Sequence, residues 1–269
     1  MITKISAGKN LSDQLIRLEI RISEKFEYAG PGQYVILRTL AENASVTCPV
    51  FKYEPTREIL TVLVPVDEDP VAEFIQATEA TSEVEMEGSF GQPFRIGNSE
   101  SVLCVASYNC MIPLLPVILA LRAAGNKITC LLTQNPGINH LPENEIRKNS
   151  DHWIATDENQ RRSFQLLEQT IRVHKFDQVI AIGHTRTIRE TSTICTATRT
   201  PVQLMLCLPE QNLRGKHGIF RVNVYCKTHS VCVDGYNFNA HYLGFDEVAK
   251  RFGSETSALK TAGQLAVSI

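Results

Sequence analysis

The sequence SVLCVASYNCMIPLLPVILALRAAG, residues 101–125, predicts a strand that leads directly into a helix. Its first six residues form a short apolar run, which is typical of a strand buried on both faces. The part from residue 111 onward predicts a helix that ends at Gly125, because glycine commonly terminates helices. We therefore expect the first strand and helix of a parallel sheet here.

The same alternation of strand and helix continues to about residue 208. The segments after 125 that predict strands are 127–134, 152–157, 176–184 and 200–208, and those that predict helices are 163–174 and 187–199. Strands that alternate with helices of this length favour a doubly wound, Rossmann-like parallel sheet, which we place at residues 99–208. Ligands bind such sheets at the carboxyl ends of the strands, so the loops after Ala106, Gln134 and Gly183 are the candidate site.

The residues before this domain predict strands of a different arrangement. Apolar and polar residues alternate in LIRLEIRIS (15–23), GQYVILRTL (32–40) and EILTVLVPV (58–66), and EVEMEGSFGQPF (83–94) closes the region. We predict an antiparallel β-barrel at residues 1–98. One short helical stretch, PVAEFIQATEA, begins at Pro70. Residues 209–269 have little regular pattern and are too few for a core of their own, which predicts a small C-terminal appendage.

Composition excludes several classes of protein. The 269 residues include 27 Lys plus Arg against 29 Asp plus Glu, for a net charge of −2, so nothing favours nucleic acid as a partner. The longest apolar run, 111–121, is broken by Pro113 and Pro116 and is shorter than the roughly 20 residues of a membrane span. The first ten residues lack the apolar stretch of a signal peptide. We expect a cytoplasmic protein without a membrane span.

Eight cysteines in such a chain predict thiols or metal ligands before disulfides. Six are scattered, most of them in apolar strand-like runs, which favours small buried side chains. Cys226 and Cys232 lie six residues apart with His229 between them. These residues, with His217, supply the nitrogen and sulfur ligands that zinc binds, although two buried thiols and two surface histidines are the simpler explanation.

Several motifs together carry a resemblance that runs over nearly the whole chain in the same order. They are GQYVIL, the closing GSFGQPF, VLCVASYNCMIPLLPVILALRAAG and VCVDGYNFNAHYLGFDEV (231–248). The chain resembles the ferredoxin-NADP reductase superfamily, and within it the small flavoprotein subunits of NADH-dependent ferredoxin-NADP oxidoreductase, sulfide dehydrogenase and dihydroorotate dehydrogenase. The resemblance implies FAD between the two domains, a nicotinamide at the second domain, a two-iron two-sulfur cluster in the appendage and a larger redox subunit as partner.

The nicotinamide motif departs from that pattern. Related chains have a glycine-rich turn at which backbone amides approach a phosphate, whereas this chain has Ala106, Ser107, Tyr108, Asn109 and Cys110 before Met111. Side chains of this size would fill the space of a pyrophosphate. We therefore predict loss of NAD(P) binding, although Tyr108 and Asn109 would line any ligand that remains.

A second loop of the resemblance begins at Gly183. It retains the glycine, followed by His184, Thr185 and Arg186. A structural turn is one interpretation of this loop, and a phosphate bound by Arg186 is the other.

The flavin motif departs as well. The resemblance implies an arginine facing the FAD phosphates where this chain has Ser45 to Val50, including Cys48 and Pro49. Its second phosphate contact corresponds to 67–70, where three carboxylates precede Pro70 and would repel a pyrophosphate, although acids there also cap a helix. The candidate FAD residues are Tyr34, Cys48, Pro49, Gly88 and Gly91, of which Tyr34, Gly88 and Gly91, together with Gly32, match the family. The sequence leaves FAD open between retention and loss.

The cluster motif has lost most of its thiolates. RVNV at 221–224 corresponds to a conserved strand of the resemblance, which places His217 and Phe220 where two cysteines belong and Asn212 where an acid belongs. Cys232 alone remains, and a phenylalanine cannot bind iron. The sequence therefore predicts no two-iron two-sulfur cluster.

Three altered motifs in one preserved framework suggest a change of role. We hypothesise an electron-transfer subunit that has lost cluster and nicotinamide binding and acts as an accessory or scaffold subunit of a heteromeric oxidoreductase. The alternative is an active FAD-dependent NAD(P)H oxidoreductase subunit in which other groups hold the cofactors.

Overall fold

The structure is a computed structural model of the 269-residue chain. It describes residues 2–12, 15–22, 29–40, 45–65, 83–98, 100–133, 141–156, 160–207, 221–224, 227–230 and 237–239.

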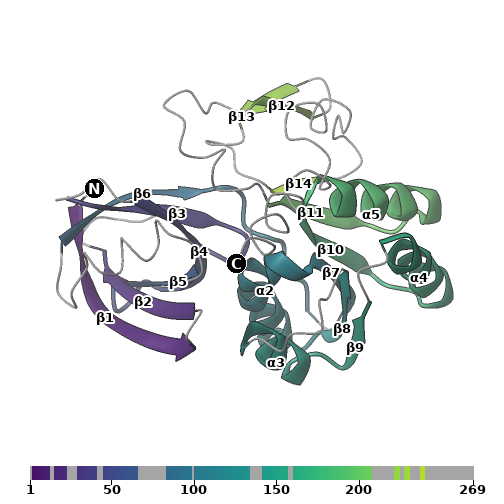
Figure 1. The fold of residues 1–269 in the computed structure, drawn as a ribbon, viewed down its shortest axis with the longest axis horizontal. Coiled ribbons are helices and arrows are strands. Elements are labelled where there is room, and N and C mark those ends of the chain that lie inside the picture. The colour runs from purple at the N-terminus through teal and green to yellow at the C-terminus, as the bar shows by residue number, and fades with distance from the viewer. Residues whose placement is uncertain are drawn as a thin grey trace, which may run out of the picture.

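The first part of the chain forms a closed antiparallel barrel with the strand order β1-β2-β5-β4-β3-β6 (Figure 1). Its strands are β1 Ile2–Ser12, β2 Leu15–Arg21, β3 Tyr34–Thr39, β4 Ser45–Glu54, β5 Ile59–Pro65 and β6 Glu83–Phe90. The predicted barrel is confirmed. The helix expected from Pro70 lies outside the described residues.

The barrel core follows from the alternation of side chains along each strand. On β3 the side chains of Val35 and Leu37 point into the barrel and are fully buried, and Val46 and Cys48 do the same on β4. The residues between them, such as Ile36 and Thr47, are only half-buried. Because successive residues of a strand face opposite sides, the outer face of β3 and β4 is free to pack on the second domain.

The second domain is built on five parallel strands in the order β11-β10-β7-β8-β9, which confirms the predicted Rossmann-like sheet (Figure 1). They are β7 Ser101–Ser107, β8 Lys127–Thr133, β9 His152–Ala155, β10 Gln178–Gly183 and β11 Val202–Leu206. A short strand, β14 Asn237–Asn239, pairs antiparallel with β11 and extends the sheet.

Helices cover both faces of this sheet, with α2 and α3 on one face and α4 and α5 on the other (Figure 1). Their bounds are η1 Tyr108–Cys110, a 3-10 turn, then α2 Met111–Ala123, α3 Leu141–Lys148, α4 Gln160–Val173 and α5 Thr185–Thr198. Helix α2 is buried over most of its length, because it contacts the sheet, α3 and β4 of the barrel.

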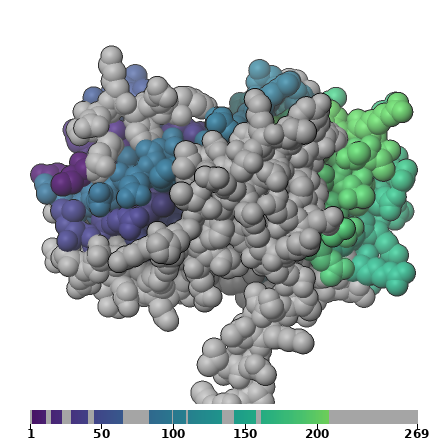
Figure 2. Space-filling view, turned by 90° about the horizontal axis from the view of Figure 1, so that it is seen from above, coloured from purple at the N-terminus to yellow at the C-terminus, as the bar shows by residue number. Residues whose placement is uncertain are grey.

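One hydrophobic core joins the two domains. Leu15, Tyr34 and Leu63 of the barrel strands belong to the same cluster of buried side chains as the strands and α2 of the second domain. Phe94, in the connecting segment, is 4% exposed and belongs to it too. In Figure 2 the residues coloured purple to blue lie toward one end of the molecule and those coloured green toward the other.

The C-terminal region is described only in part. Strands β12 Arg221–Val224 and β13 Lys227–Ser230 pair as an antiparallel hairpin, and the residues around them lie outside the described ranges. Within the described ranges, no helix has both the length and the apolar character to cross a membrane.

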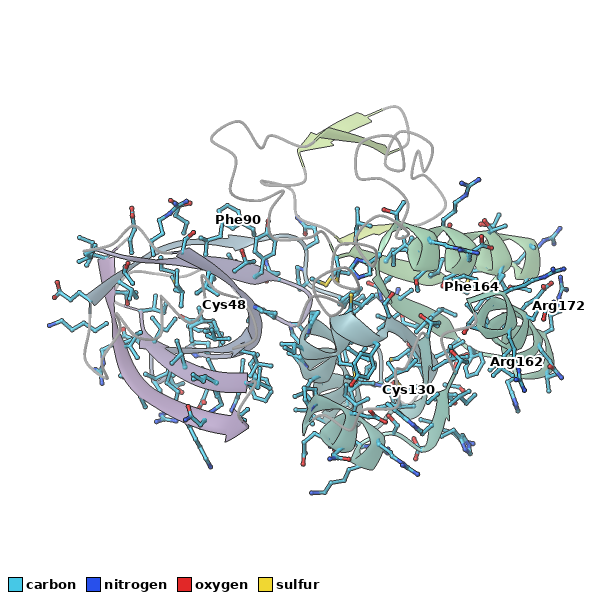
Figure 3. All side chains as sticks on the ribbon, viewed as in Figure 1. Cys48, Phe90, Cys130, Arg162, Phe164 and Arg172 are labelled. Atoms are coloured by element: carbon cyan, nitrogen blue, oxygen red, sulfur yellow. The ribbon has the colours of Figure 1, made fainter. Side chains whose placement is uncertain are left out.

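Five of the six scattered cysteines are buried thiols, as the apolar runs around them predict. They are Cys48, Cys104, Cys110, Cys130 and Cys195, while Cys207 is half-buried. Figure 3 places Cys48 inside the barrel and Cys130 within the sheet of the second domain.

Candidate functional site

The candidate site lies where β7 ends, at the carboxyl edge of the parallel sheet. Ser107 is the last residue of β7, and η1 begins at the next residue. The side chains of Tyr108 and Cys110 are 8% and 1% exposed and belong to the core shared by the two domains. Side chains of the chain itself therefore fill the turn, and α2 begins directly behind them.

The end of β10 packs closely against the end of β7. The Ser107 and Thr187 hydroxyls lie 2.9 Å apart and form a buried hydrogen bond. A Cβ atom on Gly183 would lie 2.7 Å from Ser107 Oγ and 3.0 Å from Thr187 Cβ, so only glycine fits at this position. Here the glycine makes room for a hydrogen-bonded pair of side chains.

Other hydroxyl groups along this edge are also bound within the protein. Thr133 Oγ1 donates to the Ala106 carbonyl at 3.3 Å, and Thr156 Oγ1 donates to the Leu132 carbonyl at 3.1 Å. Ser163 Oγ in turn donates to Thr156 Oγ1 at 2.6 Å. Because a buried hydroxyl with a protein partner has little left to offer a ligand, these residues stabilise the edge of the sheet.

A carboxylate lies beside the turn after β7. Glu143, in the first turn of α3, is 5% exposed, and its Oε2 atom has no hydrogen-bond partner among the described residues. Burial raises the pKa of Tyr108, and the negative charge of Glu143 raises that pKa further. The amino-terminal end of a helix stabilises a carboxylate, whereas the same negative charge repels a phosphate.

Two loops of the barrel meet around Gln33. The Gly30 amide donates to Gln33 Oε1 at 2.9 Å, and Gln33 Nε2 donates to the Gly91 carbonyl at 2.8 Å. Gly32 has φ +96°, and a Cβ there would lie 2.5 Å from the Phe94 ring. Gln33 thus ties the turn before β3 to the end of β6.

The outer face of the barrel presents two stacked aromatic rings toward the second domain. The rings of Tyr34 and Phe90 lie 5.5 Å apart between centroids and are tilted by 33°. Gly88 and Gly91 flank Phe90 with φ of +110° and +87°. A Cβ on Gly88 would lie 2.9 Å from the Phe90 ring, so this glycine lets β6 pack its aromatic residue.

Comparisons with known proteins agree with this geometry. No protein-family model matches the chain. It is 26% identical over 248 residues to the dihydroorotate dehydrogenase B (NAD(+)), electron transfer subunit homolog of Thermotoga maritima, covering 88% of each chain. A chain of the NADH-dependent reduced ferredoxin-NADP oxidoreductase structure matches it with a TM-score of 0.71 and 22% identity, covering 99% of this chain and 98% of the other. The chain has the fold of the ferredoxin-NADP reductase superfamily.

A more distant member of the superfamily has the same fold. The ferredoxin NADP+ reductase of Neisseria gonorrhoeae, in a structure with bound FAD and NADP, matches with a TM-score of 0.51 and 12% identity. The match covers 74% of this chain and 91% of that one. The fold that the resemblance to the ferredoxin-NADP reductase superfamily implies is therefore confirmed.

The turn after β7 does not fit the nicotinamide dinucleotide that this superfamily implies. Tyr108 and Cys110 are buried where a glycine turn would leave room, and Glu143 adds negative charge. Backbone amides hold a pyrophosphate only where no side chain stands in front of them.

For FAD, the described residues offer a platform without a phosphate partner. Tyr34 and Pro49 pair across β3 and β4, and Pro49 is half-buried on the outer face. Tyr34, however, is 3% exposed in the core between the domains. Residues 45–50, where the resemblance implies an arginine, contain none, and 67–70 lie outside the described residues.

The predicted site residues fall into three groups. Tyr34 and Tyr108 share the core between the domains, whereas the Cys48 side chain lies in the separate barrel core. Gly183 starts the turn into α5, and Arg186 in that helix is exposed with its guanidinium carbon 5.7 Å from the Phe164 ring centroid. Figure 3 shows Phe164 on α4, at the end of the molecule away from the barrel.

Of the predicted metal ligands, only His229, in β13, is among the described residues, and its side chain is not described. Cys226, Cys232 and His217 lie outside them, and so does the side chain of Asn109, a predicted cofactor contact. Among the residues that are described, no three His, Cys, Asp or Glu side chains gather in a way that could hold a metal ion.

Sequence reasoning missed the groups that close the carboxyl edge. Ser107 and Thr187 are 80 residues apart, and Glu143 belongs to a helix that the apolar pattern did not reveal. A serine at the end of a buried strand, facing a strand that ends in glycine, is the signal that could have indicated their contact.

Proposed function

We propose that this chain is an accessory subunit of a heteromeric oxidoreductase, of the ferredoxin-NADP reductase type, which has lost nicotinamide and cluster binding. The curated relative from Thermotoga maritima carries the name of an electron transfer subunit homolog, which supports the subunit character. The chain would bind a larger redox subunit and serve its assembly.

One observation carries the loss of nicotinamide binding: the turn at Ser107 to Cys110 is filled by the chain's own side chains. Tyr108 and Cys110 are buried in the core, so their removal from the turn would expose apolar surface at a cost of about 1.5 to 3 kcal/mol per large side chain. A dinucleotide would have to provide that free energy before it gained any contact. The turn therefore opposes binding energetically as well as sterically.

Binding of nicotinamide nucleotides to the purified full-length chain tests this part of the proposal. We expect no heat on titration with NADH or NADPH in a calorimeter at millimolar concentrations. The variant Tyr108→Gly/Cys110→Gly is the counterpart, since it removes both obstructing side chains. Stoichiometric, micromolar binding of either nucleotide to the native chain would refute the loss of nicotinamide binding.

The accessory role is tested in the native complex. We expect that deletion of this chain dissociates the complex, whereas Tyr108→Phe, which keeps the ring in the turn, leaves both assembly and NADH-dependent turnover unchanged. A complex that assembles and turns over without the chain would contradict a structural role. A complex that assembles with the Tyr108→Gly/Cys110→Gly variant but gains turnover would show that the turn is the obstruction.

The alternative is an active FAD-dependent NAD(P)H oxidoreductase subunit, and one observation favours its flavin. The barrel retains the turns at Gly32, Gly88 and Gly91 and the aromatic pair Tyr34 and Phe90 on the face toward the second domain. When bound, FAD would supply hydride acceptance and single-electron transfer. The visible absorption spectrum of the purified chain decides, because a flavin band in stoichiometric amount would favour this alternative.

A further inference from the structure

A second surface of the Rossmann-like domain lies at the opposite edge of the sheet, where β10 and β11 begin. A pocket of about 550 Å³ opens there, within the roughly 300 to 1,000 Å³ typical of small-molecule sites. Its lining consists of Arg95, Gln178, Thr196, Arg199, Pro201, Val202 and Gln203. This lining combines two guanidinium groups with no carboxylate.

The two arginines come from different parts of the molecule. Arg95 belongs to the segment that leads from the barrel into β7, and Arg199 caps the carboxyl end of α5. Arg95 forms an ion pair with Glu100. The distance from Arg95 Nη2 to Glu100 Oε1 is 3.9 Å, which is at the outer limit for such a pair. Among the described residues, Arg199 has no ion pair, so one of the two guanidinium groups in the lining is without an acidic partner.

The backbone of Arg199 adopts a conformation that arginine rarely takes. Its φ is +58° in the left-handed region, where most helices place glycine after the last turn. The Arg199 amide donates to the Thr196 carbonyl at 3.2 Å, and the Thr200 amide donates to the Cys195 carbonyl at 2.9 Å. A side chain kept at a position that suits glycine better points to a role for that side chain.

A network of side-chain amides holds the backbone of the other arginine in place. Gln203 Oε1 accepts from the Arg95 amide at 2.9 Å, and Gln203 Nε2 donates to the Arg95 carbonyl at 3.0 Å and to Gln178 Oε1 at 3.0 Å. Gln178 Nε2 also donates to the Arg95 carbonyl, at 3.3 Å. The glutamines are occupied by these bonds, so the groups left to bind a ligand are the two guanidinium groups.

We propose that this pocket binds a small oxyanion, a molecule that carries a phosphate or carboxylate group, between Arg95 and Arg199. Guanidinium groups bind both kinds of oxyanion in a bidentate manner, and no carboxylate belongs to the lining. Because Arg95 lies in the connection between the domains, an anion bound here bridges that connection to the end of α5.

The test uses the full-length chain and two probes, inorganic pyrophosphate and citrate, titrated in a calorimeter. We expect at least one probe to bind with an affinity that falls as salt is added, since salt screens charge. Binding of pyrophosphate alone would identify a phosphate ligand, and binding of citrate alone would identify a carboxylate ligand. Binding of both probes would show that the site recognises oxyanions in general. No binding of either probe overturns the proposal.

Two pocket variants and a matched control locate the site. Arg199→Gly removes one guanidinium and suits the positive φ, so we expect a folded protein. Its affinity for the probe should be lower than that of the native chain by a factor of about ten or more. Arg95→Gln should weaken binding to a similar degree. Arg57→Gln removes an exposed arginine of the barrel and should leave the affinity unchanged. Binding that is equal in the native chain and both pocket variants, or that the control weakens equally, overturns the assignment.

Discussion

The two edges of the Rossmann-like sheet treat their polar groups in opposite ways. At the carboxyl edge, Ser107, Thr133 and Thr187 bind partners inside the protein. At the amino edge, Arg95 and Arg199 line an open pocket with positive charge. Ligands of such sheets ordinarily bind at the carboxyl edge, whereas the pocket proposed here as an oxyanion site lies at the amino edge. The common fold alone therefore does not locate a ligand site in this chain.

This contrast teaches that a fold and its site are determined by different kinds of residue. The sheet depends on apolar spacing, which many residues satisfy, whereas an open edge depends on a few identities such as glycine in a turn. At the carboxyl edge the turn after β7 carries Tyr108 and Cys110, and both side chains belong to the hydrophobic core between the domains. Four predictions examine how firmly that edge is closed and how open the other edge is.

The largest effect of a single substitution at neutral pH is expected at Gly183. A Cβ there would meet Ser107 Oγ at 2.7 Å, so Gly183→Ala should lower the free energy of unfolding by about 2 kcal/mol through overpacking. In the Ser107→Ala background one obstructing atom is gone, and the loss should be smaller. Urea unfolding of the three variants measures this coupling.

Gly125→Ala is the control for that experiment. Gly125 has φ +75°, but a Cβ there would meet nothing within 4 Å. Gly125→Ala should therefore lower the free energy of unfolding through backbone strain alone, by about 1 kcal/mol, and this loss should not depend on Ser107. Equal losses of unfolding free energy at both glycines, with no rescue by Ser107→Ala, would mean that the carboxyl edge can accommodate a Cβ atom at Gly183.

Alkaline stability examines the sheet between the two edges. Cys104 and Cys130 are register partners on β7 and β8, and burial raises the pKa of Cys104 from 9.0 to about 12. The pKa of Cys130 is raised well above 9.0 by burial and by Cys104. Above about pH 9 the unfolded chain loses these protons while the native chain keeps them. Stability should thus be complete below pH 9 and fall by about 1.4 kcal/mol per pH unit for each thiol as the pH rises toward 12.

Cys104→Ala should reduce that slope when unfolding is measured from pH 8 to 10.5. Val105→Ala is the matched control, since it removes a fully buried side chain of the same strand without a titratable group. It should lower stability at every pH and leave the slope unchanged. A slope that is the same in both variants would show that the thiols are reached by solvent in the native state.

The sequence predicted the sheet well because apolar runs reveal buried strands wherever they occur. All five parallel strands were predicted, and so was the course of α2. Two of the elements that were missed have a clear physical reason. Strand β1, ITKISAGKNLS, contains glycine and several polar residues, and only pairing with β2 and β6 makes it a strand. Helix α3 has eight residues and few apolar side chains, so its pattern is weak.

The candidate site was harder to predict than the fold. The absence of glycine at Tyr108 was visible in the sequence, because it is a property of one short motif. The bond between Ser107 and Thr187 joins two distant segments, and nothing local to either segment indicates the other. The pocket at Arg95 and Arg199 was missed for the same reason, since a connecting segment and a helix end form it together.

A smaller effect is expected from the hydrogen bond that closes the carboxyl edge. Ser107→Ala leaves the Thr187 hydroxyl buried without its partner and should lower the free energy of unfolding by about 1 kcal/mol. Thr187→Val keeps the shape of the side chain and should cost a similar amount. The double variant should cost less than the sum of the two, since no orphaned hydroxyl remains. Strictly additive losses in urea unfolding would argue that the two hydroxyls do not depend on each other.

The smallest effect is expected at Arg199, and its sign is opposite to that of the others. An arginine in the left-handed region raises the free energy of the native state by about 1 to 2 kcal/mol. Glycine removes this cost, but it also makes the unfolded chain more flexible, which offsets part of the gain in stability. Arg199→Gly should therefore raise the free energy of unfolding by about 0.5 kcal/mol. Glu58→Gly, at the other non-glycine residue with positive φ, should gain as much. Only Arg199→Gly should also reduce the rise in unfolding temperature that a bound oxyanion gives the native chain, because a ligand stabilises the state that binds it. If both variants respond to pyrophosphate and citrate as the native chain does, the strain at Arg199 has no connection with the pocket.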